Sequence, residues 1–233
     1  MKLHIGTSGF GYKEWKGLFY PEKITPGDML RFYAERLHAV EINNTFYHMP
    51  TAEMLSVWTR QVPVNFIFAF KAPRLITHVK RLKNAGPEMQ YLFRTLSVLH
   101  RKLGPVLFQF PESFPADTDA LAHFLDLIPD KTPCAFEFRH PSWNNDQAGD
   151  LLRKRDLSLC TTDTDEKPAG DIIRTATWGY LRLRRSDYTG ADLGSWLEKI
   201  RGQKWKNVFV FFKHEDKAKG PELAMHFGLL ATQ

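Results

Sequence analysis

Residues 106–139 read VLFQFPESFPADTDALAHFLDLIPDKTPCAFEFR, and this stretch decides the fold class. Its two ends, Val106–Phe110 and Ala135–Arg139, are short runs rich in aromatic residues, which is typical of strands. Between them, Thr118–Leu127 places apolar residues at helical spacing. A strand, a helix and a second strand in this order indicate a βαβ unit with parallel strands.

The same alternation continues in both directions and predicts one α/β domain over residues 1–233. The expected strands are Leu3–Gly6, Val40–Asn43, Phe66–Phe70, Val106–Phe110, Ala135–Arg139, Leu157–Thr161, Gly179–Arg184 and Val208–Phe212. The expected helices are Met29–Leu37, Ala52–Gln61, Pro87–Lys102, Thr118–Leu127, Gln147–Arg155, Asp192–Arg201 and Pro221–Leu230. Eight such strands in a chain of 233 residues predict a TIM-like (β/α)8 barrel with a closed parallel sheet.

The sixth connection is the weak point of this pattern. Between Thr161 and Gly179 the chain is polar and is broken by Pro168 and Gly170, so the sixth helix is expected to be short or missing. An open doubly wound sheet is the alternative architecture. It would need a glycine-rich phosphate loop that opens a helix, whereas GTSGFG at residues 6–11 leads into a long aromatic loop.

Composition limits the class of partner. Thirty-two Lys and Arg against 26 Asp and Glu give a net charge of +6, which attracts phosphates, nucleic acid or an anionic surface. The basic residues are dispersed along the chain, so nucleic acid is possible as a partner but not favoured. The longest aromatic and aliphatic run, Val208–Phe212, is too short to span a bilayer, so we expect no membrane partner.

The cysteines indicate the compartment. Cys134 and Cys160 each lie in a strand-like apolar run and neither has a CxxC partner. We therefore expect two buried free thiols and a cytoplasmic protein. The sequence leaves the oligomeric state open.

Strand parity predicts the site, because successive side chains of a strand point to opposite faces. In the second expected strand Val40 and Ile42 share one face, and Glu41 and Asn43 share the other. The polar faces of all the strands together hold Glu41, Asn43, Lys71, Gln109, Glu137, Arg139 and Arg182. In a (β/α)8 barrel the carboxyl ends of the strands carry the active site.

These residue types suggest their roles. Glu41 and Glu137 are the candidates for general acid or base, and Lys71 and Arg139 are the candidates for stabilising an oxyanion in catalysis, with Arg182 as a further fixed donor. The structural alternative is a salt-bridge network that only fills the barrel. Buried ion pairs are poor stabilising devices, so we favour a functional site.

Further side chains at the expected strand ends complete the predicted ligand-binding set. That set is Ser8, Asn43, Asn44, Phe46, Tyr47, Gln109, His140, Trp143, Asp163, Arg182 and His214. Aromatic rings in such loops stack on sugars or bases; for Trp15, Phe19 and Tyr20 an anchoring hydrophobic cluster is the alternative. Asp163 has its own alternative, an Asx turn in its loop. The chain has no HExxH, paired-His or CxxC motif, so we expect no metal and no other cofactor, while a metal held from separate strands is left open.

Five segments carry a family resemblance: GTSGF at 6–10, WKGLFYP at 15–21, VEINNTFY at 40–47, QFP at 109–111 and FEFRHPSW at 136–143. They resemble the YecE-like family, the domain of unknown function 72, over essentially the whole chain. The resemblance implies a TIM-like barrel with no known cofactor and no settled activity. The chain departs from the family pattern with RRSDY at 184–188 and KHE at 213–215, which add charged groups at the mouth of the barrel.

The sequence is compatible with three functions. The first is an enzyme, of hydrolase, lyase or isomerase type without a nicotinamide cofactor, that uses acid–base chemistry on a small anionic, phosphorylated or carboxylated, sugar-like substrate at the carboxyl face of the barrel. Glycoside hydrolysis is a variant that depends on the separation of the two carboxyl groups. The second is a nucleic-acid-processing or nucleic-acid-binding protein. The third is a noncatalytic sensor of a small ligand, which fully Arg-paired carboxylates would favour.

Overall fold

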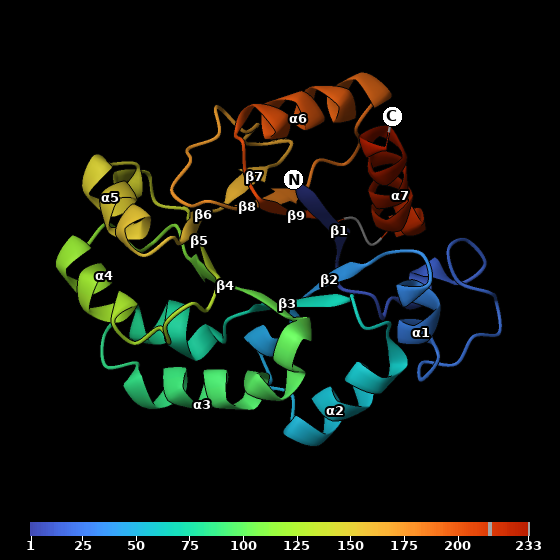
Figure 1. Cartoon of the computed structure of the whole chain (residues 1–233), viewed down its shortest axis with the longest axis horizontal. Coiled ribbons are helices and arrows are strands. Elements are labelled where there is room, and N and C mark those ends of the chain that lie inside the picture. The colour runs from blue at the N-terminus through green and yellow to red at the C-terminus, as the bar shows by residue number, and fades with distance from the viewer. Residues whose placement is uncertain (214–215, 233) are drawn as a thin grey trace.

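A single parallel sheet forms the centre of the molecule. The computed structural model describes residues 1–213 and 216–232, and it contains nine strands in the order β6-β5-β4-β3-β2-β1-β9-β8-β7. Their bounds are β1 (Lys2–Ser8), β2 (Ala39–Ile42), β3 (Ile67–Lys71), β4 (Leu103–Phe110), β5 (Cys134–Phe138), β6 (Ser158–Leu159), β7 (Thr161–Asp163), β8 (Gly179–Leu183) and β9 (Asn207–Phe212). Figure 1 shows the strands enclosed by a ring of helices, as in a TIM-like barrel.

The sheet forms a nearly closed barrel whose seam differs from the prediction. The expected sixth strand, Leu157–Thr161, divides at Cys160 into β6 and β7. Within the described ranges 1–213 and 216–232, β6 pairs with β5 alone and β7 with β8 alone. The two edges of the sheet are therefore consecutive in the chain, and the expected eight-stranded closed sheet becomes nine strands with a staggered seam.

Seven α-helices are described, and they cover the outside of the sheet (Figure 1). They are α1 (Met29–Ala34), α2 (Ala52–Gln61), α3 (Gly86–Leu96), α4 (Thr118–Leu125), α5 (Asp146–Lys154), α6 (Gly190–Gly202) and α7 (Lys219–Ala231). Residues 164–178 contain no helix, which confirms the missing sixth helix. The expected helix Pro87–Lys102 is shorter than predicted: α3 ends at Leu96, and a 3-10 segment, Ser97–Lys102, follows with a positive φ of 47° at His100.

Local signals in the sequence explain where several helices begin. The side chains of Thr51, Asp117 and Asn145 accept hydrogen bonds from the first turns of α2, α4 and α5. Thr189 and Asp192 form a reciprocal capping box at α6. Each cap satisfies backbone N–H groups that have no partner within the helix.

The apolar core has two layers that follow strand parity. The larger layer lies between the sheet and the helices. The smaller one fills the inside of the barrel and consists of Ala39, Ala69, Leu107, Ala135, Ala176, Trp178, Tyr180, Phe209 and Phe211. Small residues of β2, β3 and β5 thus share the barrel interior with aromatic rings of β8 and β9, so the interior is packed rather than open.

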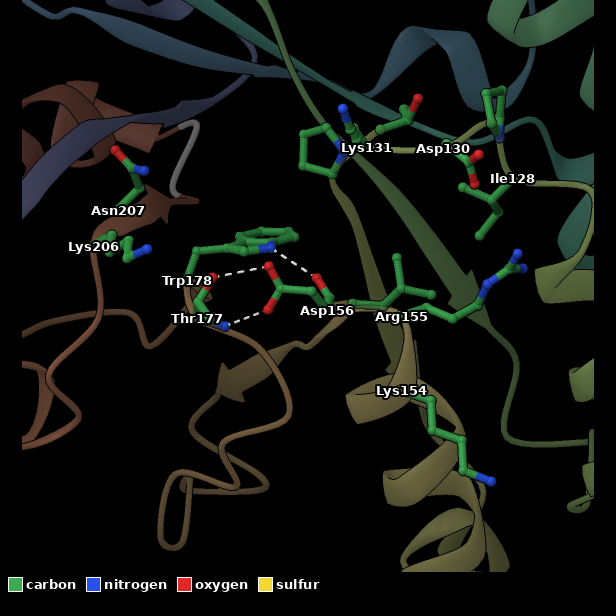
Figure 2. Close-up of a pocket in the computed structure, with 14 residues that line it drawn as sticks. Ile128, Asp130, Lys131, Lys154, Arg155, Asp156, Thr177, Trp178, Lys206 and Asn207 are labelled. Atoms are coloured by element: carbon green, nitrogen blue, oxygen red, sulfur yellow. Dashed lines mark hydrogen bonds between the residues drawn. The ribbon is translucent and has the colours of Figure 1, made fainter.

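A cavity of about 470 Å³ lies at the amino ends of the strands, among residues that precede β5, β6, β8 and β9. Figure 2 shows Asp156 beside Thr177 and Trp178 there. The Asp156 carboxylate accepts hydrogen bonds from the backbone N–H and the hydroxyl of Thr177, at 2.5 and 2.8 Å, and the Trp178 indole N–H donates to the Asp156 carbonyl at 3.0 Å. These hydrogen bonds join the segment before β6 to the segment before β8. Contacts at this end of a barrel contribute to stability.

No helix formed by residues 1–213 or 216–232 combines the length and apolar character needed to cross a membrane.

Candidate functional site

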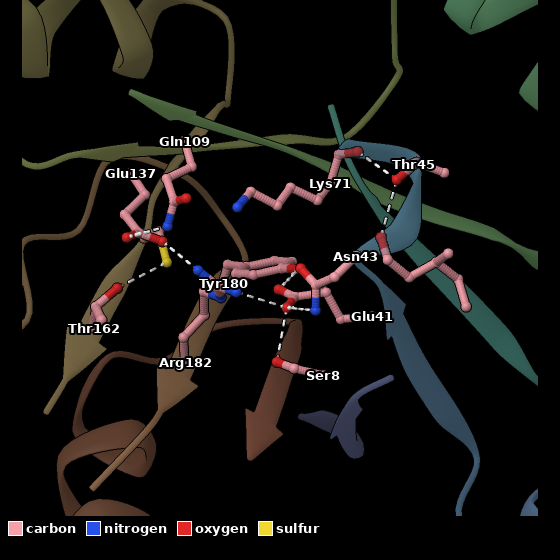
Figure 3. A network of polar contacts seen from close by, with 12 residues as sticks. Ser8, Glu41, Asn43, Thr45, Lys71, Gln109, Glu137, Thr162, Tyr180 and Arg182 are labelled. Carbon is pink, nitrogen blue, oxygen red and sulfur yellow. Dashed lines mark hydrogen bonds and ion pairs between the residues drawn. The ribbon is translucent and has the colours of Figure 1, made fainter. Parts of the chain in front are cut away.

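A charged layer lies directly above the apolar interior of the barrel, at the carboxyl ends of the strands. It follows from the two-residue period of the strands: Glu41 comes two residues after Ala39, Glu137 two after Ala135, and Arg182 two after Tyr180. Strand register brings these positions to one height, since Ser8 pairs with Glu41 and Gln109 pairs with Glu137. Figure 3 shows the resulting network.

Arg182 joins the two glutamates of the network. Its Nη1 donates to Glu137 Oε2 at 2.7 Å, and its Nη2 donates to Glu41 Oε1 at 2.9 Å. Only 2% of Arg182 is exposed, and Glu41 is fully buried. Because a guanidinium fork fills the space between the two carboxylates, the arrangement does not resemble the water-filled cleft between the paired carboxyls of an inverting glycosidase.

Glu41 is held in its ionised form. Besides Arg182, it accepts hydrogen bonds from Ser8 Oγ at 2.8 Å, Asn43 Nδ2 at 3.1 Å and the Tyr180 hydroxyl at 2.7 Å. Burial acts to raise the pKa of Glu41, but the charge of Arg182 and these donors outweigh it, so the pKa lies below its ordinary value.

Glu137 has an equally complete set of donors. Gln109 Nε2 donates to its Oε1 at 2.6 Å, and Arg139 Nε donates to the same oxygen at 3.0 Å. Burial again opposes ionisation, and the charges of Arg182 and Arg139 override it, which lowers the pKa of Glu137 to about 2. Both glutamates are therefore carboxylates throughout the physiological range.

Lys71 faces this network from the end of β3. In Figure 3 its side chain extends across the barrel toward Gln109 and Glu137. Its ammonium lies 4.0 Å from the centre of the Phe46 ring, and it forms no ion pair with any carboxylate of residues 1–213 or 216–232. Burial first, and then the charge of Arg182, lower the pKa of Lys71 from its ordinary 10.5 to about 8, against the opposing effect of the two glutamates.

A cavity of about 710 Å³ opens beside the network. Its lining consists of Glu112, Glu137, Phe138, Arg139, Cys160, Thr162, Thr164, Asp165, Glu166, Lys167 and Arg184. The seam of the barrel supplies Cys160 and Thr162 to this wall. Cys160 was expected to be buried, but it is only partly so because it lies where the strand divides; Cys134 is buried, and both thiols are free.

The structure brings together most of the predicted site residues but not all of them. Ser8, Glu41, Asn43, Gln109, Glu137, Arg139 and Arg182 form one hydrogen-bonded network, with Lys71 and Phe46 at its edge. Asn44 and Tyr47 are exposed in the loop after β2. His140 caps a local turn through Ser142. His214 lies outside the described residues.

Two residues of the predicted ligand-binding set, Trp143 and Asp163, are held by contacts within the protein. Trp143 is buried, stacks on Phe138 with ring centres 4.2 Å apart, and donates its indole N–H to the Phe114 carbonyl at 2.9 Å. Asp163 is also buried, and it accepts hydrogen bonds from the Ala169 backbone N–H at 2.8 Å and the Tyr188 hydroxyl at 3.0 Å. These contacts anchor the adjacent loops.

Two residues of the site were missed in the sequence. Tyr180 shares the parity of Arg182, and that signal was sufficient to place its hydroxyl inside the barrel. His78 lies in a single π-helical turn, Leu75–Lys80, and its ring contacts Phe46 edge-on at 4.9 Å. No pattern in the sequence signals that turn.

Comparison with known proteins agrees with this architecture. The family model described as "Protein of unknown function DUF72" matches residues 4–233. The chain belongs to the DUF72 family. It is 31% identical to the UPF0759 protein YecE of Escherichia coli K12, over 95% of this chain and 89% of that protein. It is 24% identical to the UPF0759 protein YunF of Bacillus subtilis, over 92% of this chain and 79% of that protein.

Solved structures of DUF72 proteins confirm the fold. The DUF72 protein of Thermotoga maritima superimposes with a TM-score of 0.87 at 26% identity, and the match covers 100% of both chains. A DUF72 protein of Enterococcus faecalis gives a TM-score of 0.79 at 19% identity, over 99% of this chain and 96% of that one. The family resemblance and the TIM-like barrel predicted from the sequence are both confirmed.

Metal ligands do not gather in the described part of this DUF72 barrel. Across residues 1–213 and 216–232, no group of three or more His, Cys, Asp or Glu side chains comes close enough to hold an ion.

Proposed function

We propose that the mouth of the barrel binds a small anionic molecule, phosphorylated or carboxylated and sugar-like, and that the protein is an enzyme acting on it. The observation that carries this proposal is the charge balance of the layer at the strand ends. Lys71, Arg139 and Arg182 supply three cations, and Glu41 and Glu137 supply two carboxylates. An anion entering here compensates the remaining positive charge, so no charge is left buried without a counter-ion.

The lowered pKa of His78 supports a positive electrostatic potential at the mouth of the barrel. The pKa of His78 is lowered from 6.5 to about 4, first by burial and then by the charges of Lys71, Arg74 and Arg139. Several cations thus act on one point from different elements. Such clustering raises the local concentration of anions.

Arg139 offers the most direct contact for an anion. Its Nε donates to Glu137, and within the described part of the chain its two terminal amino groups form no hydrogen bond. With 38% of its side chain exposed at the edge of the cavity, it combines access with an orientation fixed by Glu137. Arg presents two parallel donors to phosphate or carboxylate.

Asn43 supports the sugar-like character of the ligand. Its Nδ2 donates to the Glu41 carboxylate, which fixes the orientation of the amide because a carboxylate only accepts. Its Oδ1 is buried and accepts no hydrogen bond within residues 1–213 and 216–232. Buried acceptors are rarely left without a donor, and a ligand hydroxyl is one that fits.

We assign the acid–base role to Lys71 rather than to the two glutamates. A carboxylate with a pKa near 2 is a weak base and holds no proton to donate near neutral pH. We assign Glu41 and Glu137 the task of orienting Arg182 and Arg139. Lys71, with a pKa of about 8, is the group of the layer that exchanges a proton near neutral pH.

A noncatalytic ligand sensor is the second candidate. The full pairing of both carboxylates favours it, because such a site binds without a free acid or base among its glutamates. The lowered pKa of Lys71 favours the enzyme. Turnover of a bound metabolite separates the two.

Thermal-shift titration with inorganic phosphate tests the proposal. If phosphate binds with a dissociation constant of about 1 mM, then 10 mM phosphate stabilises the protein by about 1.4 kcal/mol, or about 3–6 °C for a chain of this size. Arg139→Ala should lose this shift. Arg201→Ala is the matched control, since Arg201 is similarly exposed on α6 and pairs with Glu198.

Sodium chloride at equal ionic strength controls for general salt effects. The proposal fails if wild-type protein shows no phosphate-specific shift, or if Arg139→Ala and Arg201→Ala respond alike.

A further inference from the structure

We infer that Lys71 forms an imine with the carbonyl carbon of an anionic aldehyde or ketone bound in the mouth of the barrel. The inference rests on the proposed anion site and adds a covalent step to it. It also narrows the substrate class from a small anion to one that carries a carbonyl group, such as a 2-oxo acid or a phosphorylated ketose or aldose.

The first support is the rigid placement of Lys71. It is the last residue of β3, and the Thr45 hydroxyl is 2.5 Å from its backbone carbonyl. The next residue, Ala72, donates its N–H to the Leu107 carbonyl at 2.8 Å. The strand end is therefore fixed on both sides, and the amine projects from a rigid element, as a reacting group requires.

The second support is that the nearby carboxylates are already paired with other residues. Glu41 and Glu137 each bind Arg182 and further donors, so neither forms an ion pair with Lys71. The ammonium contacts the face of the Phe46 ring instead, at 4.0 Å. A lysine with a purely structural charge role is normally paired with a carboxylate, whereas a half-buried lysine beside other cations is the arrangement that yields a reactive amine.

The titratable groups around Lys71 come from several elements of the barrel. His78, in the turn after β3, is itself affected by the charge of Lys71. The groups that act on Lys71 are Glu41 on β2, Glu137 on β5, Arg139 directly after β5, and Arg182 on β8. Their combined effect, after burial, is the pKa of about 8. At pH 8 about half of the Lys71 side chains are then neutral amines, compared with less than about 1% for a lysine with an ordinary pKa.

The chemical step balances without an added oxidant or reductant. The neutral amine attacks the carbonyl carbon; the C–N bond forms as the C=O π bond breaks, and a proton moves from the attacking nitrogen to the oxygen. The resulting carbinolamine hydroxyl takes a second proton and leaves as water, which gives a protonated imine. In total, one ammonium and one carbonyl compound give one iminium ion and one water.

Arg139 is the residue that would bind the anionic group of the substrate during this reaction. Arg139 lies at the edge of the same network, and within residues 1–213 and 216–232 it binds Glu137 through its Nε, while its terminal amino groups form no hydrogen bond. Holding the anion at Arg139 while Lys71 attacks the carbonyl would make the reaction effectively intramolecular.

Reductive trapping tests the inference on the intact protein. The protein is incubated at pH 8 with pyruvate or with dihydroxyacetone phosphate, cyanoborohydride is added, and the adduct is located by peptide mass spectrometry. We expect one adduct per chain, on Lys71, formed at least tenfold faster than on any surface lysine. The two probes distinguish a carboxylated from a phosphorylated substrate, and acetone, which lacks an anionic group, should label Lys71 much more slowly.

Lys71→Arg should abolish the adduct, and Lys80→Arg should leave it unchanged, because the Lys80 ammonium is paired with Glu88 at 2.7 Å. Labelling of surface lysines at the same rate as Lys71, or no adduct on Lys71 with either anionic probe, would overturn the inference. If phosphate still stabilises the protein in an Arg139-dependent manner, that result removes the imine and keeps the anion site. If the phosphate response is absent as well, both proposals fail.

Discussion

Among residues 1–213 and 216–232, Arg182 is the cation that binds both glutamates of the charged layer, so replacing it tests how that layer is stabilised. In an Arg182→Met variant the methionine side chain fills most of the space of the arginine methylene groups, but both carboxylates lose a hydrogen-bond donor. Glu41 keeps its three neutral hydrogen-bond donors and, within the part of the chain that the structure describes, loses the cation that pairs with it. Glu137 keeps Gln109 and Arg139. Breaking a buried ion pair in this way costs about 3–5 kcal/mol of unfolding free energy.

The pH dependence of this loss has a definite sign. In the wild type, the folded-state pKa values of Glu41 and Glu137 lie below the ordinary value of 4.5. Their contribution to stability is therefore present above that value and is lost only as the pH falls through the folded-state values, about 2 for Glu137. In Arg182→Met burial is no longer opposed by the guanidinium, so the pKa of Glu41 rises above its ordinary value. Its penalty is then full at neutral pH and declines as acid protonates it.

Urea unfolding, monitored by tryptophan fluorescence at pH 7.5 and pH 5, measures both effects. We expect a loss of about 3–5 kcal/mol at pH 7.5 and a clearly smaller loss at pH 5. Adding Glu41→Gln to the variant should restore part of the stability at pH 7.5, and Arg201→Met should change it by less than about 0.5 kcal/mol. A loss below about 1 kcal/mol, or an equal loss at both pH values, would refute the reasoning.

Three further outcomes follow from the structure. Trp143→Phe removes the hydrogen bond to the Phe114 carbonyl and should cost about 1–3 kcal/mol in urea unfolding while phosphate binding is unchanged; weakened binding would return Trp143 to the site. Thiol labelling of the native protein should modify Cys160 before Cys134, and two free thiols should appear after denaturation without reductant; the reverse order contradicts the placement of Cys160 at the cavity wall. We also expect residues 1–233 to unfold as one domain, because β1 pairs with both β2 and β9, so fluorescence and far-UV circular dichroism should give coincident transitions; two separate transitions would exclude this.

The fold was accessible from the sequence because its signals are local. The VLFQF and AFEFR runs show the period of two that separates Gln109 and Glu137 from the phenylalanines on the outer face, and the helices between strands show their own period. The same parity placed Glu41, Lys71 and Arg182 inside the barrel. Residues that share a strand face and a height meet in any closed parallel sheet, so the core of the network needed no long-range information.

The features that the sequence did not reveal depend on distant partners. Trp143 follows the end of β5, where a ligand-binding residue could also stand. That its indole N–H donates to the Phe114 carbonyl depends on the position of Phe114, 29 residues earlier in the chain. Asp163 anchors its loop through Tyr188, which lies 25 residues away in the chain. The division of the strand at Cys160 arises from closing the sheet, since that segment must pair with β5 on one side and β8 on the other.

The most direct test of the central claim is to locate a bound anion. Crystals of the protein soaked in selenate give an anomalous difference map in which each selenium site appears as a peak. We expect the strongest peak at the mouth of the barrel, within hydrogen-bonding reach of Arg139 and close to Lys71, and we expect that peak to be lost in Arg139→Ala crystals. A map whose peaks lie only on the outer surface or in the cavity beside Asp156, with none at the charged layer, would contradict it.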